Sequence, residues 1–410
     1  MLNKILSNKK NTHLLVALYL LVLIFFLYYF TQPKTENPFN YFIYLADAFI
    51  HGRLDVIDTP FYFEELIEWQ DKFFTIYPPM PAVILTPFVA LFGMSFSQVL
   101  ASVILGAFNV SIFYLLMKRL TDKEDIQIWM TLLFGFGTIH WYTSTIGSVW
   151  YFAQIVSLFF MLLAIYETFG RRNLFVIGLL LGASYWSRIP TVLSLPFFLI
   201  ILSDSWFPQI KEGVLIKRVQ FKPLILLGSG IAVFILLNFL YNYLRFGTPM
   251  DTAYSLHTIS SAKNVVSPWF DKGLFSLSYV KHHLYVFLLH PPVVTDSWPY
   301  IVPSMVGLSV LITTPAFILV LFAGIRNKFS IACWVAILPI AFLIFLKSGT
   351  GWTQFGYRYA LDFYPFLLLL TLKGIGDKLR WYHKLLIGIS ILVNIWGVFF
   401  INKFEWYKLY

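Results

Sequence analysis

Long apolar runs separated by short polar connections extend along the chain from residue 14 to residue 402. A helix that crosses a bilayer needs roughly 20 predominantly apolar residues, and about eleven runs approach that length. The pattern therefore predicts a single all-α membrane domain over residues 1–410 with about eleven spanning helices. The expected spans are 14–30, 98–117, 126–146, 150–168, 174–187, 188–203, 223–241, 299–322, 330–346, 359–372 and 385–402.

The composition supports lipid as the surrounding solvent, because 59% of the residues are hydrophobic and only 12% are charged. Soluble domains carry about 25% charged residues. The net charge is +10, and most lysines and arginines fall in alternate connections between the expected spans. Basic connections mark the cytoplasmic side. We therefore expect a multi-pass protein of the cytoplasmic membrane with its N-terminus inside and its C-terminus outside, and no nucleic-acid partner.

Two long connections, residues 31–97 and 242–298, are then expected to lie outside the cell. The first contains "YPPMPAVILTPFVALFG", which is apolar but short and rich in proline. Counting it as a span would reverse the orientation of every later connection, so we expect a helix lying at the outer interface. Upstream, "YFIYLADAFIHG" predicts a short amphipathic helix that carries Asp47 and ends near Gly52.

Ionisable side chains collect at the outer ends of the expected spans. Arg188, Arg358 and Asp362 lie near those ends, and Lys347 and Arg245 lie just beyond them. The acids of the first long connection fall on the same side. An ion-coupled transporter would more often carry carboxylates or broken helices near the midplane. The distribution therefore favours an active site at the outer surface.

Structural roles for the same residues stay open. A lysine or arginine at a helix end is often an anchor at the interface. Arg358 and Asp362 have the i,i+4 spacing of an ion pair on a helix. Trp352 and Tyr359 are also typical of an aromatic belt, and Asp47 of a solvated helix face.

No cofactor is expected. His282, His283 and His290 suggest zinc, but no carboxylate stands at a supporting spacing, and we expect no metal site. The only cysteine, Cys333, lies within an apolar run. The chain contains no phosphate-binding loop, dinucleotide fingerprint or nucleophile elbow, which disfavours a nucleotide-sugar donor or ATP.

Several short motifs resemble those of the GT-C superfamily of integral membrane glycosyltransferases. "TIYPPMPAVILTPFVALFG" is similar to the Tyr-x-x-Pro-Pro interfacial helix of the aminoarabinose and protein O-mannosyl transferases. "YWSRIPTVLSLPFF" resembles an Arg-x-Pro helix start of bacterial members. "YNYLRFGTPMDTAY" and "FGYRYALDFYPFLLLL" resemble motifs of their later outer loops. The resemblance extends from about residue 37 to residue 370, and it implies sugar transfer from a polyprenyl phosphate on the extracytoplasmic side.

The chain departs from the family at one position. An Asp-Glu pair usually follows the first span, about fifteen residues before the loop glycine, and here Asn37 and Pro38 stand there. The nearest acid is Asp47, our first candidate for the catalytic base. Glu64, Glu65 and Asp58 are the alternatives that the same connection offers.

The resemblance implies roles for the remaining candidates. Arg358 is the first choice to bind the donor phosphate, with Arg188, Arg245 and Lys347 as alternatives, since an arginine fork matches phosphate oxygens. Further contacts to the sugar or a cover over the cleft are expected from Tyr77, Trp352, Tyr359 and Lys72. The acceptor would be an envelope lipid, glycan or protein, and transfer would invert the anomeric centre. A flippase or transporter of lipid-linked sugars and an inactive scaffold are the alternatives, and Asn37 favours the scaffold.

Overall fold

The computed structural model describes residues 9–35, 37–207, 220–250, 253–256, 272–351 and 353–404. This part of the chain is mostly helical and includes two short antiparallel hairpins, β1–β2 and β3–β4. The N-terminal elements are α2 (Lys9–Thr31), α3 (Tyr41–Ile50), β1 (Leu66–Trp69), β2 (Lys72–Thr75), α4 (Met80–Phe92), η1 (Gly93–Ser95), α5 (Gln98–Leu120), α6 (Glu124–Phe136), α7 (His140–Ile146) and α8 (Val149–Thr168). The later elements are α9 (Leu174–Tyr185), η2 (Ile189–Ser194), α10 (Leu195–Ile201), η3 (Ser203–Ser205), α11 (Phe221–Phe246), α13 (Ser278–Leu288), β3 (Val293–Val294), β4 (Ile301–Val302), α14 (Val310–Thr313), η4 (Pro315–Phe322), α15 (Lys328–Leu346), η5 (Arg358–Asp362), α16 (Tyr364–Ile375) and α17 (Trp381–Phe404).

Six helices in the described residues are long and apolar enough to cross a membrane. They are α5, α8, α11, α15, α17 and the segment Thr12–Thr31 of α2. Each coincides with an expected span, so the prediction of a helical membrane protein is confirmed at this level. The count of eleven crossings and their orientation stay predictions.

The other five expected spans are shorter or interrupted. The run 126–146 divides into α6 and α7 around Gly137, and 174–203 divides into α9, η2 and α10. The run 299–322 begins with β4 and holds only the short helices α14 and η4, while 359–372 is a 3₁₀ turn followed by α16. Proline stands in the first turn of η2, α10, η4 and α16. Because proline lacks the amide proton that an inner helical turn needs, it starts a new helix rather than extending the previous one.

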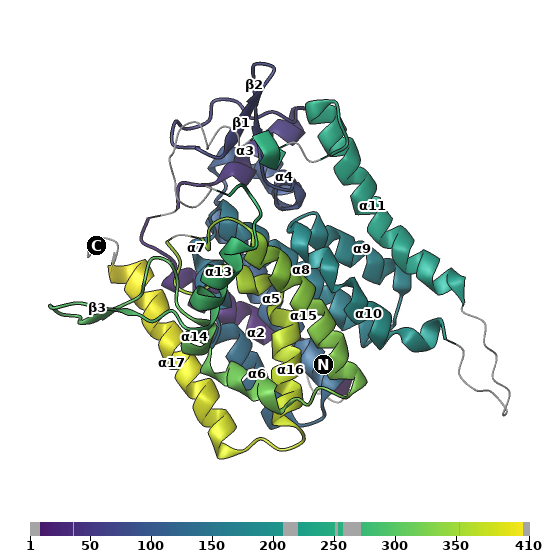
Figure 1. Cartoon of the computed structure of the whole chain (residues 1–410), viewed down its shortest axis with the longest axis vertical. Coiled ribbons are helices and arrows are strands. Elements are labelled where there is room, and N and C mark those ends of the chain that lie inside the picture. Colours follow the sequence, from purple (N-terminus) through teal and green to yellow (C-terminus); the bar gives the residue numbers. More distant parts are fainter. Residues whose placement is uncertain are drawn as a thin grey trace, which may run out of the picture.

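The helices α9 and α11 approach each other through glycine. A Cβ atom on Gly178 would lie 2.1 Å from the carbonyl oxygen of Leu227, and one on Gly230 would lie 2.3 Å from that of Phe175. Larger residues would clash at both positions, so backbone packs directly against backbone. Figure 1 shows α11 running along the edge of the molecule beside α9.

The first long connection forms a layer of its own over one end of the helices (Figure 1). Within it, the rings of Tyr41 and Phe63 stack with centroids 3.8 Å apart, and Phe42 reaches Phe152 of α8 at 6.1 Å. The amide of Val149 also donates to the Phe39 carbonyl at 2.9 Å. These contacts fix the connection on the helices below it.

The two helices that the sequence predicts in this connection are present. α4 begins after Pro79, and α3 ends at Ile50, two residues before Gly52, whose φ is +67°. The hairpin β1–β2 was not expected. Its turn places Gln70 and Asp71 at φ of 51° and 58°, a conformation for which hairpins usually use asparagine and glycine.

Candidate functional site

A cavity of about 370 Å³ lies between the first long connection and the helix ends. Its walls come from segments far apart in the sequence, including the start of α8, the start of η2 and the end of α15. The cavity brings together six of the predicted site residues: Glu65, Tyr77, Arg188, Lys347, Arg358 and Tyr359. A concave, mostly apolar cleft with a few convergent polar groups is the usual form of a small-molecule site.

Arg358 is the most enclosed cation of this cavity, with only 6% of its surface exposed. Its guanidinium lies 5.8, 5.0 and 5.3 Å from the ring centroids of Trp150, Tyr151 and Tyr359. These aromatic faces stabilise a positive charge without neutralising it. Within the described part of the chain, Arg358 forms no ion pair and its buried Nε has no hydrogen-bond partner. Its main-chain carbonyl is held by the Gln154 side chain at 2.9 Å.

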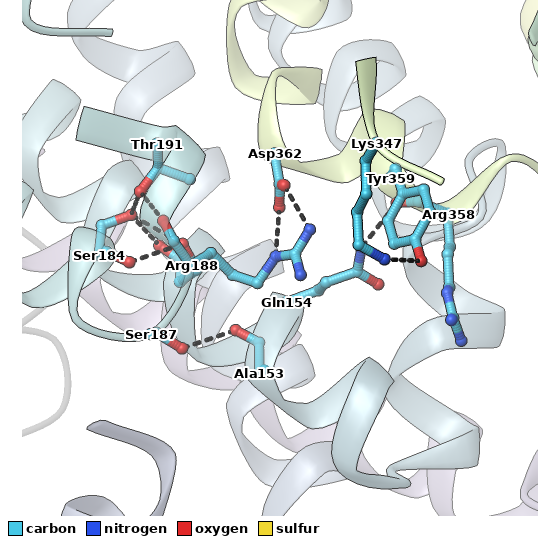
Figure 2. A network of polar contacts seen from close by, with 11 residues as sticks. Ala153, Gln154, Ser184, Ser187, Arg188, Thr191, Lys347, Arg358, Tyr359 and Asp362 are labelled. Atoms are coloured by element: carbon cyan, nitrogen blue, oxygen red, sulfur yellow. Dashed lines mark hydrogen bonds and ion pairs between the residues drawn. The ribbon is translucent and has the colours of Figure 1, made fainter. Parts of the chain in front are cut away.

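Arg188 has a different environment, because it forms a bidentate pair with Asp362 (Figure 2). Its Nη2 and Nε atoms lie 2.6 and 3.0 Å from the two carboxylate oxygens. The spacing of Arg358 and Asp362 left an ion pair between those two residues open, and the structure instead pairs Asp362 with Arg188. Residues 358–362 form a 3₁₀ turn, and three residues per turn do not align positions i and i+4.

Lys347 follows the last turn of α15 and points toward Tyr359 (Figure 2). Its Nζ atom lies 3.3 Å from the Tyr359 hydroxyl and 5.2 Å from the centre of that ring. Tyr359 therefore lies beside both Lys347 and Arg358, and it holds the two cations at one wall of the cavity.

Glu65 is the carboxylate that the first long connection contributes. It stands just before β1, and its side chain accepts a hydrogen bond from Trp150 Nε1 at 2.7 Å. Burial raises the pKa of Glu65 above its ordinary value, although the Trp150 hydrogen bond and the charges of Lys347 and Arg358 act in the opposite direction. A carboxyl group with a raised pKa is suited to accept a proton near neutral pH.

The remaining predicted residues do not line the cavity. Asp47 was expected to face it, and its position is corrected, since its carboxylate lies 3.5 Å from Arg53 and from His51. Asp58 is exposed, and Lys72 lies 3.6 Å from Asp55.

Arg245 is also outside the cavity. It donates to the Thr75 carbonyl at 2.9 Å and to the Asn242 side chain at 2.7 Å, so it ties α11 to the hairpin. Trp352 lies outside the described residues.

Three residues of the cavity region were not singled out in the sequence: Trp150, Tyr151 and Gln154. They share the first turns of α8, in "VWYFAQ". Two aromatic residues at the end of an apolar run are typical of an interfacial belt, so Trp150 and Tyr151 gave no separate indication of a binding role. Gln154, a polar residue one turn further into the apolar run, was the signal in the sequence that could have indicated this site.

The described residues contain no group of three histidine, cysteine, aspartate or glutamate side chains arranged to hold a metal ion. His283 and His290 instead bind main-chain oxygens, of Lys347 at 2.8 Å and of Gly307 at 2.9 Å. These two histidines therefore connect loop segments.

In comparison with known proteins, no protein-family model matches the chain, and the search of curated proteins found no similar sequence.

Proposed function

We propose that the protein is a glycosyltransferase that moves a sugar from a polyprenyl-phosphate donor to an acceptor hydroxyl on the extracytoplasmic side of the membrane. The observation that carries the proposal is the meeting of Glu65 with Arg358 and Lys347 in one cavity. The carboxylate supplies a base for the acceptor hydroxyl. The two cations supply positive charge for the leaving phosphate.

The charges of the cavity support a singly charged phosphate. Asp362 neutralises Arg188, so the lining retains Lys347 and Arg358 as positive groups and Glu65 as a negative one. Their sum is one positive charge when all three are ionised and the Tyr359 hydroxyl keeps its proton. Burial raises the pKa of Tyr359, but the charges of Lys347 and Arg358 lower it to about 7. A sugar phosphodiester carries one negative charge, whereas a diphosphate-linked sugar carries two.

In the proposed reaction, the acceptor oxygen forms a bond to the anomeric carbon while the bond from that carbon to the phosphate oxygen breaks. The electron pair leaves with the phosphate, and Arg358 and Lys347 stabilise its charge. Glu65 takes the proton of the acceptor hydroxyl. Removing one such preorganised cation typically lowers kcat about 10²–10³-fold. Loss of a general base typically costs about 10²–10⁴-fold.

The test is to incubate the purified protein with a panel of radiolabelled polyprenyl-phosphate sugars and extracted envelope acceptors. The proposal expects loss of one donor, with polyprenyl phosphate as the released product. Asp47→Asn should transfer at the wild-type rate, because Asp47 does not line the cavity. An absence of turnover across the panel, or turnover that Arg358→Ala leaves unchanged, contradicts the proposal.

A further inference from the structure

His283 of α13 connects the two segments that carry the cations of the cavity. Its side chain is fully buried, at 0% exposure. Nε2 lies 2.8 Å from the carbonyl oxygen of Lys347, and Nδ1 lies 2.6 Å from the hydroxyl of Tyr357, the residue before Arg358. One imidazole therefore bonds to both ends of the polar segment between α15 and η5.

The partners of His283 determine where its proton lies. A main-chain carbonyl only accepts hydrogen bonds, so Nε2 carries the proton and donates it to Lys347. Burial lowers the pKa of His283 to about 4, and the ring is therefore neutral at physiological pH. Nδ1 is then an acceptor, and the Tyr357 hydroxyl donates to it. Both ring nitrogens are satisfied only in this tautomer.

Residues 274–276, which precede α13 in the second long connection, form main-chain hydrogen bonds to the residues on both sides of Lys347. Ser276 N donates to the Leu346 carbonyl, and Ser348 N donates to the Leu274 carbonyl, each at 2.8 Å. These bonds fix the strand direction at Lys347, and the imidazole adds the link to Tyr357. Tyr359 also contacts both residues, since its hydroxyl lies 3.3 Å from Lys347 Nζ and its ring packs edge-on against Tyr357 with centroids 6.0 Å apart. His283 is the side chain that hydrogen-bonds to both Lys347 and Tyr357.

We propose that His283 is a positioning residue that, together with Tyr359, fixes the separation between the Lys347 ammonium and the Arg358 guanidinium. It does not line the cavity, so it acts through these two residues. The expected effect of His283 on sugar transfer rests on the proposed function. Its expected effect on the position of Lys347 does not depend on any activity.

The first readout is the kinetics of His283→Ala and His283→Gln, with His282→Ala as the matched control. His282 is the adjacent residue of α13, and its side chain is exposed. A misplacement of about 1 Å can lower a rate about 10²-fold, so we expect His283→Ala to lower kcat by about 10–100-fold. Glutamine places an amide near the position of Nε2, and His283→Gln should recover part of that loss. His282→Ala should match the wild type.

The second readout requires no sugar donor. The Lys347 amine is acylated with a water-soluble succinimidyl ester, and mass spectrometry gives the rate at each lysine. Without the bond from His283 to its carbonyl, Lys347 should react about threefold faster or more in His283→Ala, because local opening exposes the amine. His283→Gln, whose amide replaces Nε2, should react at a rate between that of His283→Ala and that of the wild type. Lys281, which is exposed on the same helix, is the internal reference and should react at an unchanged rate.

The two readouts separate the possible failures. Unchanged Lys347 labelling in His283→Ala, in protein that retains the fold by size-exclusion and circular dichroism, overturns the positioning role whatever the activity. Faster labelling in a protein that turns over no donor supports the positioning role and overturns the proposed function alone. Faster labelling at every lysine indicates general loosening and contradicts a specific role for His283.

Discussion

The buried pair of Arg188 and Asp362 gives the most quantitative prediction for stability. The Asp362 side chain is 1% exposed, and both of its oxygens lie within 3.0 Å of the guanidinium. Asp362→Ala removes the carboxylate and leaves the guanidinium charge in a largely closed site. Breaking a buried pair from one side typically costs about 3–5 kcal/mol, because the remaining charge loses its only compensation.

The double variant Arg188→Met with Asp362→Leu removes both charges and keeps the volume similar. Replacement of a complete buried pair by apolar residues of similar volume is often neutral or stabilising by about 1–4 kcal/mol. The double variant should therefore be more stable than Asp362→Ala, although it carries more substitutions. That reversal separates a charge effect from the loss of packing.

The assay is equilibrium unfolding by SDS titration in mixed micelles. The exposed Asp204 is the matched control, since it pairs with Lys328 at 2.9 Å and Arg172 at 3.4 Å while 37% exposed. Surface pairs contribute at most about 1 kcal/mol, so Asp204→Asn should change the unfolding free energy little. If Asp362→Ala costs no more than Asp204→Asn, or the double variant is less stable than Asp362→Ala, the reasoning is refuted.

The remaining predictions concern the site and the packing. Arg358→Lys keeps the charge but loses the planar guanidinium, so we expect kcat/KM for the donor to fall by at least roughly 10-fold. A transfer rate equal to that of the wild type would contradict this role of Arg358. The acidic limb of the pH–rate profile should lie above the usual pH for a glutamate, because burial raises the pKa of Glu65 and the base acts only when ionised. Trp150→Phe removes a hydrogen bond that lowers this pKa and should move the limb to still higher pH, whereas an unmoved limb would exclude Glu65 as the titrating group. In Gly178→Leu the new Cβ would clash with the Leu227 carbonyl oxygen, so the variant should separate α9 from α11 and lower the midpoint of thermal unfolding. An unchanged midpoint would contradict this packing.

Much of the site was predictable because it lies on long apolar runs with charged ends. Six spans followed from length and hydropathy, and the polar residues beyond them were predictable as neighbours, since helix ends lie at similar depth. Arg358, Lys347 and Tyr359 were found in this way and do share the cavity.

The choice of carboxylate was not predictable from local pattern. Asp47 lies on a well-marked amphipathic helix, whereas Glu65 precedes a hairpin whose turn has no glycine. Its partner Trp150 is 85 positions away in the chain, and only tertiary packing brings the two together. Sequence pattern reports which face of an element is apolar, but not which loop folds over which helix end.

The ion pair of Asp362 illustrates a second limit. The i,i+4 rule assumes an α-helix, and η5 is a 3₁₀ turn that directs Asp362 toward Arg188. The tyrosine-rich sequence before Pro365 carries no local signal for that change of geometry. Because Asp362 pairs with Arg188, Arg358 keeps its charge for the proposed phosphate contact.

The central claim is that Arg358 binds the donor phosphate while Glu65 acts on the acceptor, and it is tested most directly by measuring binding and transfer separately. Donor affinity is measured by microscale thermophoresis with a polyprenyl-phosphate sugar, and transfer by single-turnover kinetics. Glu65→Gln should bind the donor as the wild type does and lose about 10²–10⁴-fold in transfer. Glu64→Gln, at the adjacent exposed position, should leave both unchanged, and Arg358→Ala should weaken both. Wild-type transfer by Glu65→Gln, or undiminished donor binding by Arg358→Ala, would contradict the account.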